Sequence, residues 1–369
     1  MKIAVLTSSR ADYGIYQPLL KRLKADDSIE LSIIAFGSHC SEKFGNTVNQ
    51  IEQDGFEVLY KISNLVDGDA PIDIANSYAK TVSLFADFWA NHLAFDWVLC
   101  LGDRFEMAAA VNAGIPFGVN FAQIHAGETT LGAIDNVYRH QISLASKLHF
   151  VATESYAERI HALIGETGTT ELVGSLSLEN IETIPFLSKH EFNEKWDIDL
   201  EIPTILMTIH PETVDYAQNS EFIEELKLTI PELLVNHQLV VTLPNADTFG
   251  SLFHAFFHEI KQLYPEKVCL IENFGTQSYF TCMKYADLLI GNTSSGIIEA
   301  ATFGKFVINL GNRQGGRACS ENVVTVPFKH LAILQEFTKL KGKIYTGSNC
   351  YYQKDSANKV LERLKKERQ

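Results

Sequence analysis

Residues 287–304 combine an apolar run, a hydroxyl-rich turn and a helical pattern. Residues 288–290 have the length and character of a buried strand, and Thr293, Ser294 and Ser295 can each cap a helix that continues to residue 303. The free N–H groups at such a helix start, from Gly296 onward, attract an anion such as phosphate. Glu299 could accept hydrogen bonds from the two hydroxyls of a ribose. The alternative is an ordinary capped helix that binds nothing.

A second concentration of reactive side chains occupies residues 123–135, a glycine-punctuated loop after a predicted strand. His125, Glu128 and Asp135 place one imidazole and two carboxylates there, which are groups suited to proton transfer. Each of them alone could be a helix cap, but three in one loop favour a functional site. We expect no metal site, because no spacing matches a two-histidine-carboxylate set or a cysteine set.

Charged residues also follow two strands predicted near the N-terminus. Arg10 could reach a phosphate with its guanidinium, or it could pair with Asp12 on the surface. Asp103 and Arg104 are either a charged pair that shapes their loop or part of a site. Both alternatives remain open at this point.

The second half of the chain repeats this arrangement of polar residues after predicted strands. His210 ends one strand, although a histidine satisfied by a backbone carbonyl is the alternative. Asn245 ends the next strand with the same ambiguity. Arg313 lies on a glycine-rich loop, and arginines concentrated after strand ends indicate a diphosphate partner.

The elements that must position these residues alternate between strand and helix, which predicts an α/β fold with parallel sheets. Strands are expected at residues 2–7, 31–36, 56–60, 97–101, 117–124, 149–152, 204–209, 239–243, 268–271, 288–290 and 306–310. Helices are expected at residues 15–23, 42–52, 72–93, 135–146, 222–234, 250–263 and 357–368, with another that ends at residue 113.

The alternation lapses at residues 181–203, where we expect a linker between two domains. Residues 1–185 would form an N-terminal Rossmann-like domain and residues 186–369 a C-terminal one, with the last helix packed back on the body. Two doubly wound domains of this kind are expected to face a cleft, and the polar loops would point into it.

Composition limits the kind of partner. A length of 369 residues with 46% apolar and 21% charged residues is typical of a globular protein with two cores. The net charge of −14 argues against nucleic acid or an anionic membrane as a partner. The six cysteines form no CxxC pair and are expected to be small core residues in a reducing cytoplasm.

Taken in order, the motifs resemble the hydrolysing UDP-N-acetylglucosamine 2-epimerases of bacterial sialic-acid synthesis. The resemblance extends from the first predicted strand to about Val324. The motifs that carry it are Ser9-Arg10-Ala11-Asp12-Tyr13-Gly14, Gly102-Asp103-Arg104, Ala126-Gly127-Glu128, Asp135 with Arg139-His140, Gly174-Ser175, His210-Pro211-Glu212, residues 291–300 and Arg313-Gln314.

The resemblance implies a GT-B-type fold in which the second domain holds most of the nucleotide and the first domain faces the sugar. The enzyme would remove the C2 proton and expel UDP, and water would then add to the 2-acetamidoglycal to release N-acetylmannosamine. No cofactor is implied, and a cytoplasmic homodimer or homotetramer is expected.

The same resemblance assigns roles to the residues named above. Asp103, Glu128 and Asp135 lie on the sugar side, with their division between acid and base left open. Helix N–H groups, Arg10, Arg313 and His210 stabilise the leaving diphosphate. The expected nucleotide-binding set also includes Arg104, Asn245, Ser294, Ser295, Gly296 and Glu299.

Two departures from the family pattern bear on the substrate. Many relatives have glutamate at the position of His125, so either the imidazole takes over an acid–base step or the position is not essential. Some relatives have an arginine near the nucleotide where this chain has residues 274–277 (Phe-Gly-Thr-Gln).

Several other functions remain open. A UDP- or GDP-linked 2,4-diacetamido-2,4,6-trideoxy sugar is the alternative substrate. A non-hydrolysing 2-epimerase, a GT-B glycosyltransferase and a non-catalytic nucleotide-sugar binder are the alternative functions.

Overall fold

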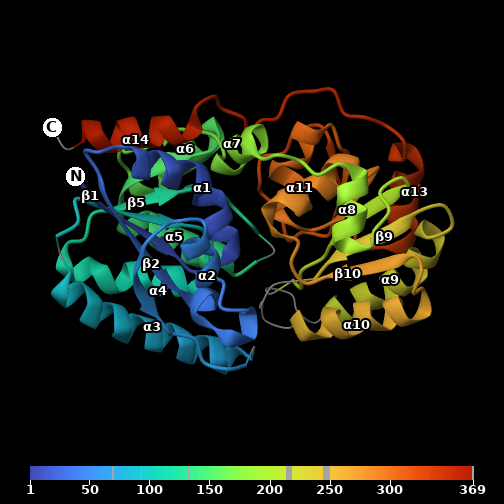
Figure 1. The fold of residues 1–369 in the computed structure, drawn as a ribbon, viewed down its shortest axis with the longest axis horizontal. Helices are drawn as coiled ribbons and strands as arrows, with labels where there is room; N and C mark the ends of the chain where they lie inside the picture. The colour runs from blue at the N-terminus through green and yellow to red at the C-terminus, as the bar shows by residue number, and fades with distance from the viewer. Residues whose placement is uncertain (69, 93, 132, 213–217, 244–249, 368–369) are drawn as a thin grey trace. The chain divides into compact units, whose positions relative to one another are not determined.

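Two compact units make up the protein in the computed structural model (Figure 1). The structure describes residues 1–68, 70–92, 94–131, 133–212, 218–243 and 250–367. Unit 1 comprises residues 1–128, 135–182 and 351–369, and unit 2 comprises residues 129–134 and 183–350. The chain therefore crosses between the units more than once.

Unit 1 is built on a sheet of seven strands in the order β3-β2-β1-β4-β5-β6-β7, and all of its strand pairs are parallel. Residues on both faces of such a sheet are buried, which explains the continuous apolar runs in the sequence. The strands are β1 (Lys2–Thr7), β2 (Glu30–Phe36), β3 (Val58–Ile62), β4 (Trp97–Leu101), β5 (Phe121–Ile124), β6 (Ser146–Val151) and β7 (Thr170–Leu172).

Helices cover both faces of this sheet (Figure 1). One core contains Leu20 of α1 together with Val360 and Leu364 of α14. The core on the opposite face contains Phe85 of α3 and Met107 of α4. The helices are α1 (Arg10–Ala25), α2 (Val48–Gln53), α3 (Pro71–Asn91), α4 (Phe105–Gly114), α5 (Asp135–Ala145), α6 (Glu154–Ile164), α7 (Leu176–Thr183) and α14 (Ser356–Lys366).

Unit 2 repeats the design with six strands in the order β10-β9-β8-β11-β12-β13, again with parallel pairs. The strands are β8 (Thr204–Thr208), β9 (Gln238–Thr242), β10 (Val268–Ile271), β11 (Leu288–Gly291), β12 (Val307–Leu310) and β13 (Val323–Val326). The helices are α8 (Lys189–Trp196), α9 (Asn219–Leu233), α10 (Gly250–Leu263), α11 (Gly275–Tyr285), α12 (Ser294–Ile298) and α13 (His330–Leu340).

Each sheet has one point at which the strand order reverses direction, between β1 and β4 in unit 1 and between β8 and β11 in unit 2. In open parallel sheets, ligands bind beyond the carboxyl ends of the strands at this switch point. The predicted α/β class of two Rossmann-like sheets is confirmed. The loops at each switch point are the place where a ligand of that unit is expected to bind.

Several predicted elements differ from the structure. The first helix begins earlier than the predicted residue 15, because Ser9 caps α1 and the helix starts at Arg10. The helix predicted at residues 42–52 is divided at Gly45, whose left-handed backbone ends a short 3-10 turn. The predicted linker contains α8, which Ser188 caps.

The helix predicted to continue to residue 303 is also divided. It consists of α12, which is five residues long, and the 3-10 segment η5 (Ala300–Phe303). Glu299 lies between the two and is buried.

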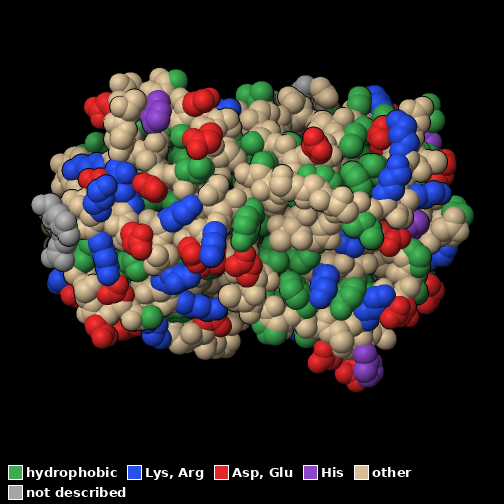
Figure 2. Space-filling model, turned by 90° about the horizontal axis from the view of Figure 1, so that it is seen from above, with side chains coloured by type: hydrophobic (Ala, Val, Ile, Leu, Met, Phe, Trp, Pro, Cys, Tyr) green, Lys and Arg blue, Asp and Glu red, His purple; other side chains and the backbone are tan. Residues whose placement is uncertain are grey.

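The surface departs from one prediction about the cysteines. Cys319 and Cys350 are exposed, so only part of the set consists of buried core residues such as Cys100 and Cys282. On the face shown in Figure 2, acidic and basic side chains are interspersed. Across the described residues, no helix has the length and apolar character needed to cross a membrane.

Candidate active site

At the switch point of unit 1, the loop after β1 is held by Asp12. The carboxylate of Asp12 accepts hydrogen bonds from the Ser8 N–H at 3.0 Å and from the Ser8 hydroxyl at 2.8 Å. The Asp12 N–H donates to the Ser9 hydroxyl at 3.3 Å, which caps α1. Asp12 is buried whereas Arg10 is exposed. The alternative of a surface pair between them was therefore wrong about the position of Asp12.

Burial also changes the acidity of this carboxyl group. It raises the pKa of Asp12 to about 6, against the lowering effects of the Ser8 hydrogen bonds and of the Arg104 charge. Asp12 therefore binds a proton at a higher pH than an ordinary aspartate does.

The loop after β4 carries two charged residues with separate partners. The backbone of Gly102 is left-handed, with φ of +90°, which favours glycine. Asp103 accepts a hydrogen bond from the Arg139 guanidinium of α5, and Arg139 is only 2% exposed. Arg104 donates to the buried carboxylate of Glu106 at 2.6 Å. Asp103 therefore forms an ion pair with Arg139, and Arg104 forms one with Glu106.

The loop after β5 brings a histidine, a glutamate and a serine together. The His125 Nδ1 lies 2.6 Å from the Glu128 Oε1, and both residues are buried. The His125 Nε2 lies 3.4 Å from the Ser175 hydroxyl, which is 2.9 Å from the Ser177 hydroxyl. A carboxylate on Nδ1 fixes the orientation of an imidazole and stabilises its protonated form. The carboxylate, the imidazole and the hydroxyls form one buried chain of polar groups.

The backbone of this loop is tightly confined. His125 has a φ of +60°, in the left-handed region that a non-glycine residue seldom adopts. A Cβ on Gly127 would lie 2.4 Å from the Tyr156 carbonyl oxygen, so only glycine fits there. Arg159 of α6 donates to the Gly127 carbonyl at 2.6 Å. These contacts position Glu128 next to His125.

The remaining predicted acid, Asp135, is the first residue of α5 and is partly buried. It lies four residues before Arg139 on the same helix, a spacing that places both on one face. Between Glu128 and Asp135 the chain belongs to unit 2, where the Leu131 N–H donates to the Gly315 carbonyl at 2.9 Å.

At the switch point of unit 2, Asn292 joins the loops after β8 and β11. The His210 N–H donates to the Asn292 side-chain oxygen at 2.7 Å, and the Asn292 amide donates to the His210 carbonyl at 2.8 Å. Gln314, from the loop after β12, donates to the Asn292 carbonyl at 2.7 Å. Three loops are therefore held as one platform.

The loop after β12 is attached to the same platform by further bonds. Arg313 donates through Nε to the Pro211 carbonyl at 3.3 Å. The Asn312 N–H donates to the carboxylate of Glu212 at 3.0 Å. The predicted residues His210 and Arg313 are consequently on connected loops.

The turn after β11 places hydroxyl groups at the start of α12. Thr293 is the N-cap, and its hydroxyl accepts from the Ser295 N–H at 3.4 Å. Ser294, Ser295 and Gly296 form the first turn, and Glu299 follows the last residue of the helix. Because α12 has only five residues, its dipole is small, and the donors available to an anion are the local N–H groups and hydroxyls.

Glycines allow this turn to approach the neighbouring strands. A Cβ on Gly291 would lie 2.0 Å from the Thr208 carbonyl oxygen of β8, and a Cβ on Gly296 would lie 3.1 Å from Val307 of β12. Asn245, the remaining predicted site residue, lies outside the described residues.

Several residues that hold the site were not selected from the sequence. Arg139, Ser175, Asn292 and Gln314 appear in the motifs or next to them, but only contacts across the fold reveal what they bind. The four-residue spacing of Asp135 and Arg139 was a usable signal, since such residues share a helix face.

Comparison with known proteins gives consistent results. A family model described as UDP-N-acetylglucosamine 2-epimerase matches residues 21–365. A Campylobacter jejuni GDP/UDP-N,N'-diacetylbacillosamine 2-epimerase (hydrolyzing) is 34% identical over 93% of this chain and 88% of its own length. A Legionella pneumophila UDP-N,N'-diacetylbacillosamine 2-epimerase (hydrolyzing) is also 34% identical, over 99% of this chain and 95% of its own.

The fold has close counterparts among solved structures. The crystal structure of UDP-GlcNAc 2-epimerase from Neisseria meningitidis bound to UDP-GlcNAc superposes with a TM-score of 0.80 at 18% identity. The superposition covers 99% of this chain and 100% of the other. At this identity, the likeness concerns the fold.

Proposed function

This chain belongs to the UDP-N-acetylglucosamine 2-epimerase family, and from that premise we propose that it is a hydrolysing 2-epimerase of a UDP-linked N-acetylated hexose. The observation that carries the proposal is the buried contact between His125 and Glu128, with the Ser175 hydroxyl at the other ring nitrogen. This is a proton-transfer group in a loop that follows a strand of unit 1.

The reaction needs two acid–base groups. In the first step a base removes the C2 proton, the C1–O bond breaks and UDP leaves, giving a 2-acetamidoglycal. In the second step water adds its hydroxyl to C1, an acid delivers a proton to the opposite face of C2, and the proton that the water loses returns to the carboxylate of that acid. Among the carboxylates of unit 1, Glu128 is paired with His125 and Asp103 with Arg139, and we assign one of these two pairs to each step. Asp135 supports them electrostatically.

The departing UDP carries negative charge that must be stabilised. The C2 proton is weakly acidic because no carbonyl is adjacent to it, so departure of UDP has to lead the elimination. The platform of unit 2 offers His210, Arg313 and the N–H groups of the first turn of α12 for the diphosphate. Glu299 would accept from the ribose hydroxyls. Arg10 and Arg104 are assigned to the phosphates as well.

Two substrates fit this reaction. The 34% identity to the two diacetylbacillosamine epimerases favours a UDP-linked 2,4-diacetamido-2,4,6-trideoxy hexose. UDP-N-acetylglucosamine is the second candidate, and the Neisseria structure of the same fold was solved with it bound. The cytoplasmic location and the homo-oligomeric state stay predictions.

The experiment that tests the proposal is proton NMR of the enzyme with each sugar nucleotide in heavy water. A hydrolysing 2-epimerase releases free UDP and a free sugar with the inverted configuration and deuterium at C2. The substrate with the higher kcat/KM is the one that the enzyme is built for.

Three other results would contradict parts of the proposal. A UDP-linked 2-epimer as product would identify a non-hydrolysing enzyme. Transfer of the sugar to an acceptor would identify a glycosyltransferase. Binding without turnover of either nucleotide sugar would identify a binder.

A further inference from the structure

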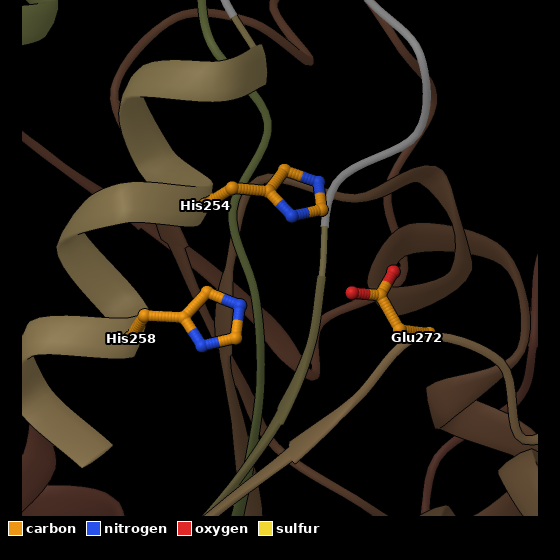
Figure 3. A group of neighbouring side chains, drawn as sticks. All are labelled: His254, His258 and Glu272. Carbon is orange, nitrogen blue, oxygen red and sulfur yellow. The ribbon is translucent and has the colours of Figure 1, made fainter. Parts of the chain in front are cut away.

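Three potential metal ligands of unit 2 meet between α10 and the carboxyl end of β10 (Figure 3). His254 and His258 lie on successive turns of α10, and Glu272 is the residue that follows β10. Their ligand atoms all lie within 4.8 Å of one another. In Figure 3 the two imidazoles project from the same side of the helix, and the Glu272 carboxylate points toward them.

The scaffold sets the positions of these three residues in advance. Phe253 and Phe257, each next to one of the histidines in sequence, are fully buried in the core of unit 2. Since successive residues of an α-helix lie about 100° apart, burial of this face places the two histidines on the adjacent flank of α10. Glu272 is placed by β10, which pairs with β9 in parallel register. The backbone therefore requires no rearrangement to bring the ligands together.

The ligand types match a borderline-soft divalent metal. Two neutral imidazoles and one carboxylate form a set that binds Zn²⁺, whereas Ca²⁺ and Mg²⁺ take shells of oxygen atoms. Zinc–ligand bonds of about 2.0–2.2 Å in a tetrahedron place the ligand atoms about 3.3–3.5 Å apart. His258 and Glu272 are exposed, so rotation of these side chains can close the remaining distance.

We propose that His254, His258 and Glu272 bind one Zn²⁺ ion, which ties the first turns of α10 to the chain that leaves β10. The sequence predicted no metal site, because Glu272 lies on a different element from the two histidines and only the fold adds it to the set. Three protein ligands leave one coordination position for water or for a small ligand. Because β10 is the edge strand of its sheet, the ion would fasten this edge to its covering helix.

The test uses full-length protein without a histidine tag, stripped of metal with a chelator. Zn²⁺ is titrated by calorimetry, and Co²⁺ is added separately because its visible absorption reports coordination geometry. We expect one Zn²⁺ per chain, a tetrahedral Co²⁺ spectrum and a Tm that rises with Zn²⁺ concentration, since a metal that binds only the folded state stabilises it.

Two variants and one control locate the ion. His258→Gln and Glu272→Gln should each weaken Zn²⁺ binding at least about tenfold, the smallest effect seen when even a supporting residue is lost. Both positions are exposed, so the metal-free variants should have the same Tm as the metal-free wild type. His190→Gln is the control, because His190 and Glu194 of α8 form an exposed pair with a 3.7 Å separation in the same unit.

Two results would overturn the site. The first is wild-type protein that takes up no Zn²⁺. The second is one equivalent of Zn²⁺ bound with unchanged affinity by both variants.

Discussion

Glu128 offers the most direct residue-scale test of the proposed proton transfer, because it is 2% exposed and contacts His125. In Glu128→Gln the amide keeps the volume of the side chain but can neither accept a proton nor stabilise a protonated imidazole. We expect kcat to fall by at least about 100-fold, a typical contribution of general acid–base catalysis. The affinity for UDP, measured by calorimetry, should stay the same.

The matched control for this variant is Glu158→Gln, an exposed position on α6 of the same unit. The kcat of Glu158→Gln should equal that of the wild type. Wild-type turnover in Glu128→Gln would remove the pair from the mechanism, and a parallel loss of UDP binding would indicate a structural role.

Asp103 carries a second residue-scale prediction, in which structure and catalysis can be separated. Asp103→Asn leaves the buried Arg139 guanidinium with an amide partner, so the free energy of unfolding in urea should fall by about 1–3 kcal/mol. Turnover should be lost while UDP binding persists. The double variant Asp103→Asn with Arg139→Gln removes the buried charge that the Asp103 carboxylate balanced, and it should regain stability but not turnover. Recovery of turnover in the double variant would show that Asp103 acts only on the fold.

At the scale of elements, the unit 2 platform depends on Asn292. Its side chain makes reciprocal bonds with His210, which join the loops after β8 and β11. Asn292→Ala leaves both backbone groups of His210 without this partner, and two such losses amount to about 2–6 kcal/mol of unfolding free energy. The affinity for UDP should fall too, because the loops lose their fixed arrangement.

Asn309→Ala provides the comparison for that variant. Asn309 is buried in β12 of the same unit, and its amide donates to the Thr325 hydroxyl at 3.1 Å. This change should lower stability without changing the affinity for UDP. Equal effects of both variants on UDP binding would assign the loss at Asn292 to general destabilisation.

Near the start of α1, two buried groups, Asp12 and His39, change the stability of the fold with pH in opposite directions. Asp12 has a pKa raised from 3.8 to about 6, so the folded state holds its proton longer and stability falls as pH rises from about 4 to 6. The His39 ring bonds to the Thr7 hydroxyl, and burial lowers its pKa from 6.5 to about 4. The unfolded state therefore binds the proton more readily, and stability falls as pH drops from 6.5 to 4.

The two effects are each worth about 3 kcal/mol and nearly cancel in the same pH range. In Asp12→Asn only the effect of His39 remains, so this variant should lose stability toward pH 4 more steeply than the wild type. In His39→Gln only the effect of the Asp12 carboxyl group remains, so this variant should lose stability as the pH rises toward 6.5. Urea unfolding at pH 4.5 and 6.5 measures both slopes, and identical slopes in all three proteins would refute the opposing pair.

The elements also show what the sequence could predict. Strands such as β4 were found because burial on both faces leaves an unbroken apolar run. The start of α1 was missed because residues 8–14 are polar, and their helical state depends on the Ser9 cap. In the candidate site, the reactive residues were recognisable by type and by position after strands. Their supports, such as Arg139 and Asn292, were not, because their bonds join segments far apart in sequence.

At the scale of the whole molecule, the chain order differs from the spatial order. Residues 129–134 pack within unit 2, and residues 351–369 return to unit 1, where α14 completes a core begun by α1. The Ala357 N–H donates to the Glu179 carboxylate at 2.8 Å, and the Tyr156 and Tyr351 hydroxyls lie 2.7 Å apart. Residues of α14 therefore share one core with residues near the start of this sequence.

This return predicts that α14 contributes to the stability of unit 1. Leu364 is fully buried, so Leu364→Ala should lower the free energy of unfolding by about 2–5 kcal/mol through lost burial and the cavity that remains. Leu331→Ala, a change of the same kind on α13 at a side chain that is 70% exposed, should have little effect. Hydrogen exchange locates the change, because Leu364→Ala should speed exchange in β1 and α1 more than in β8. Equal exchange in both sheets would mean that the two units unfold as a single cooperative body, and no change at all would mean that α14 packs on unit 1 without stabilising it.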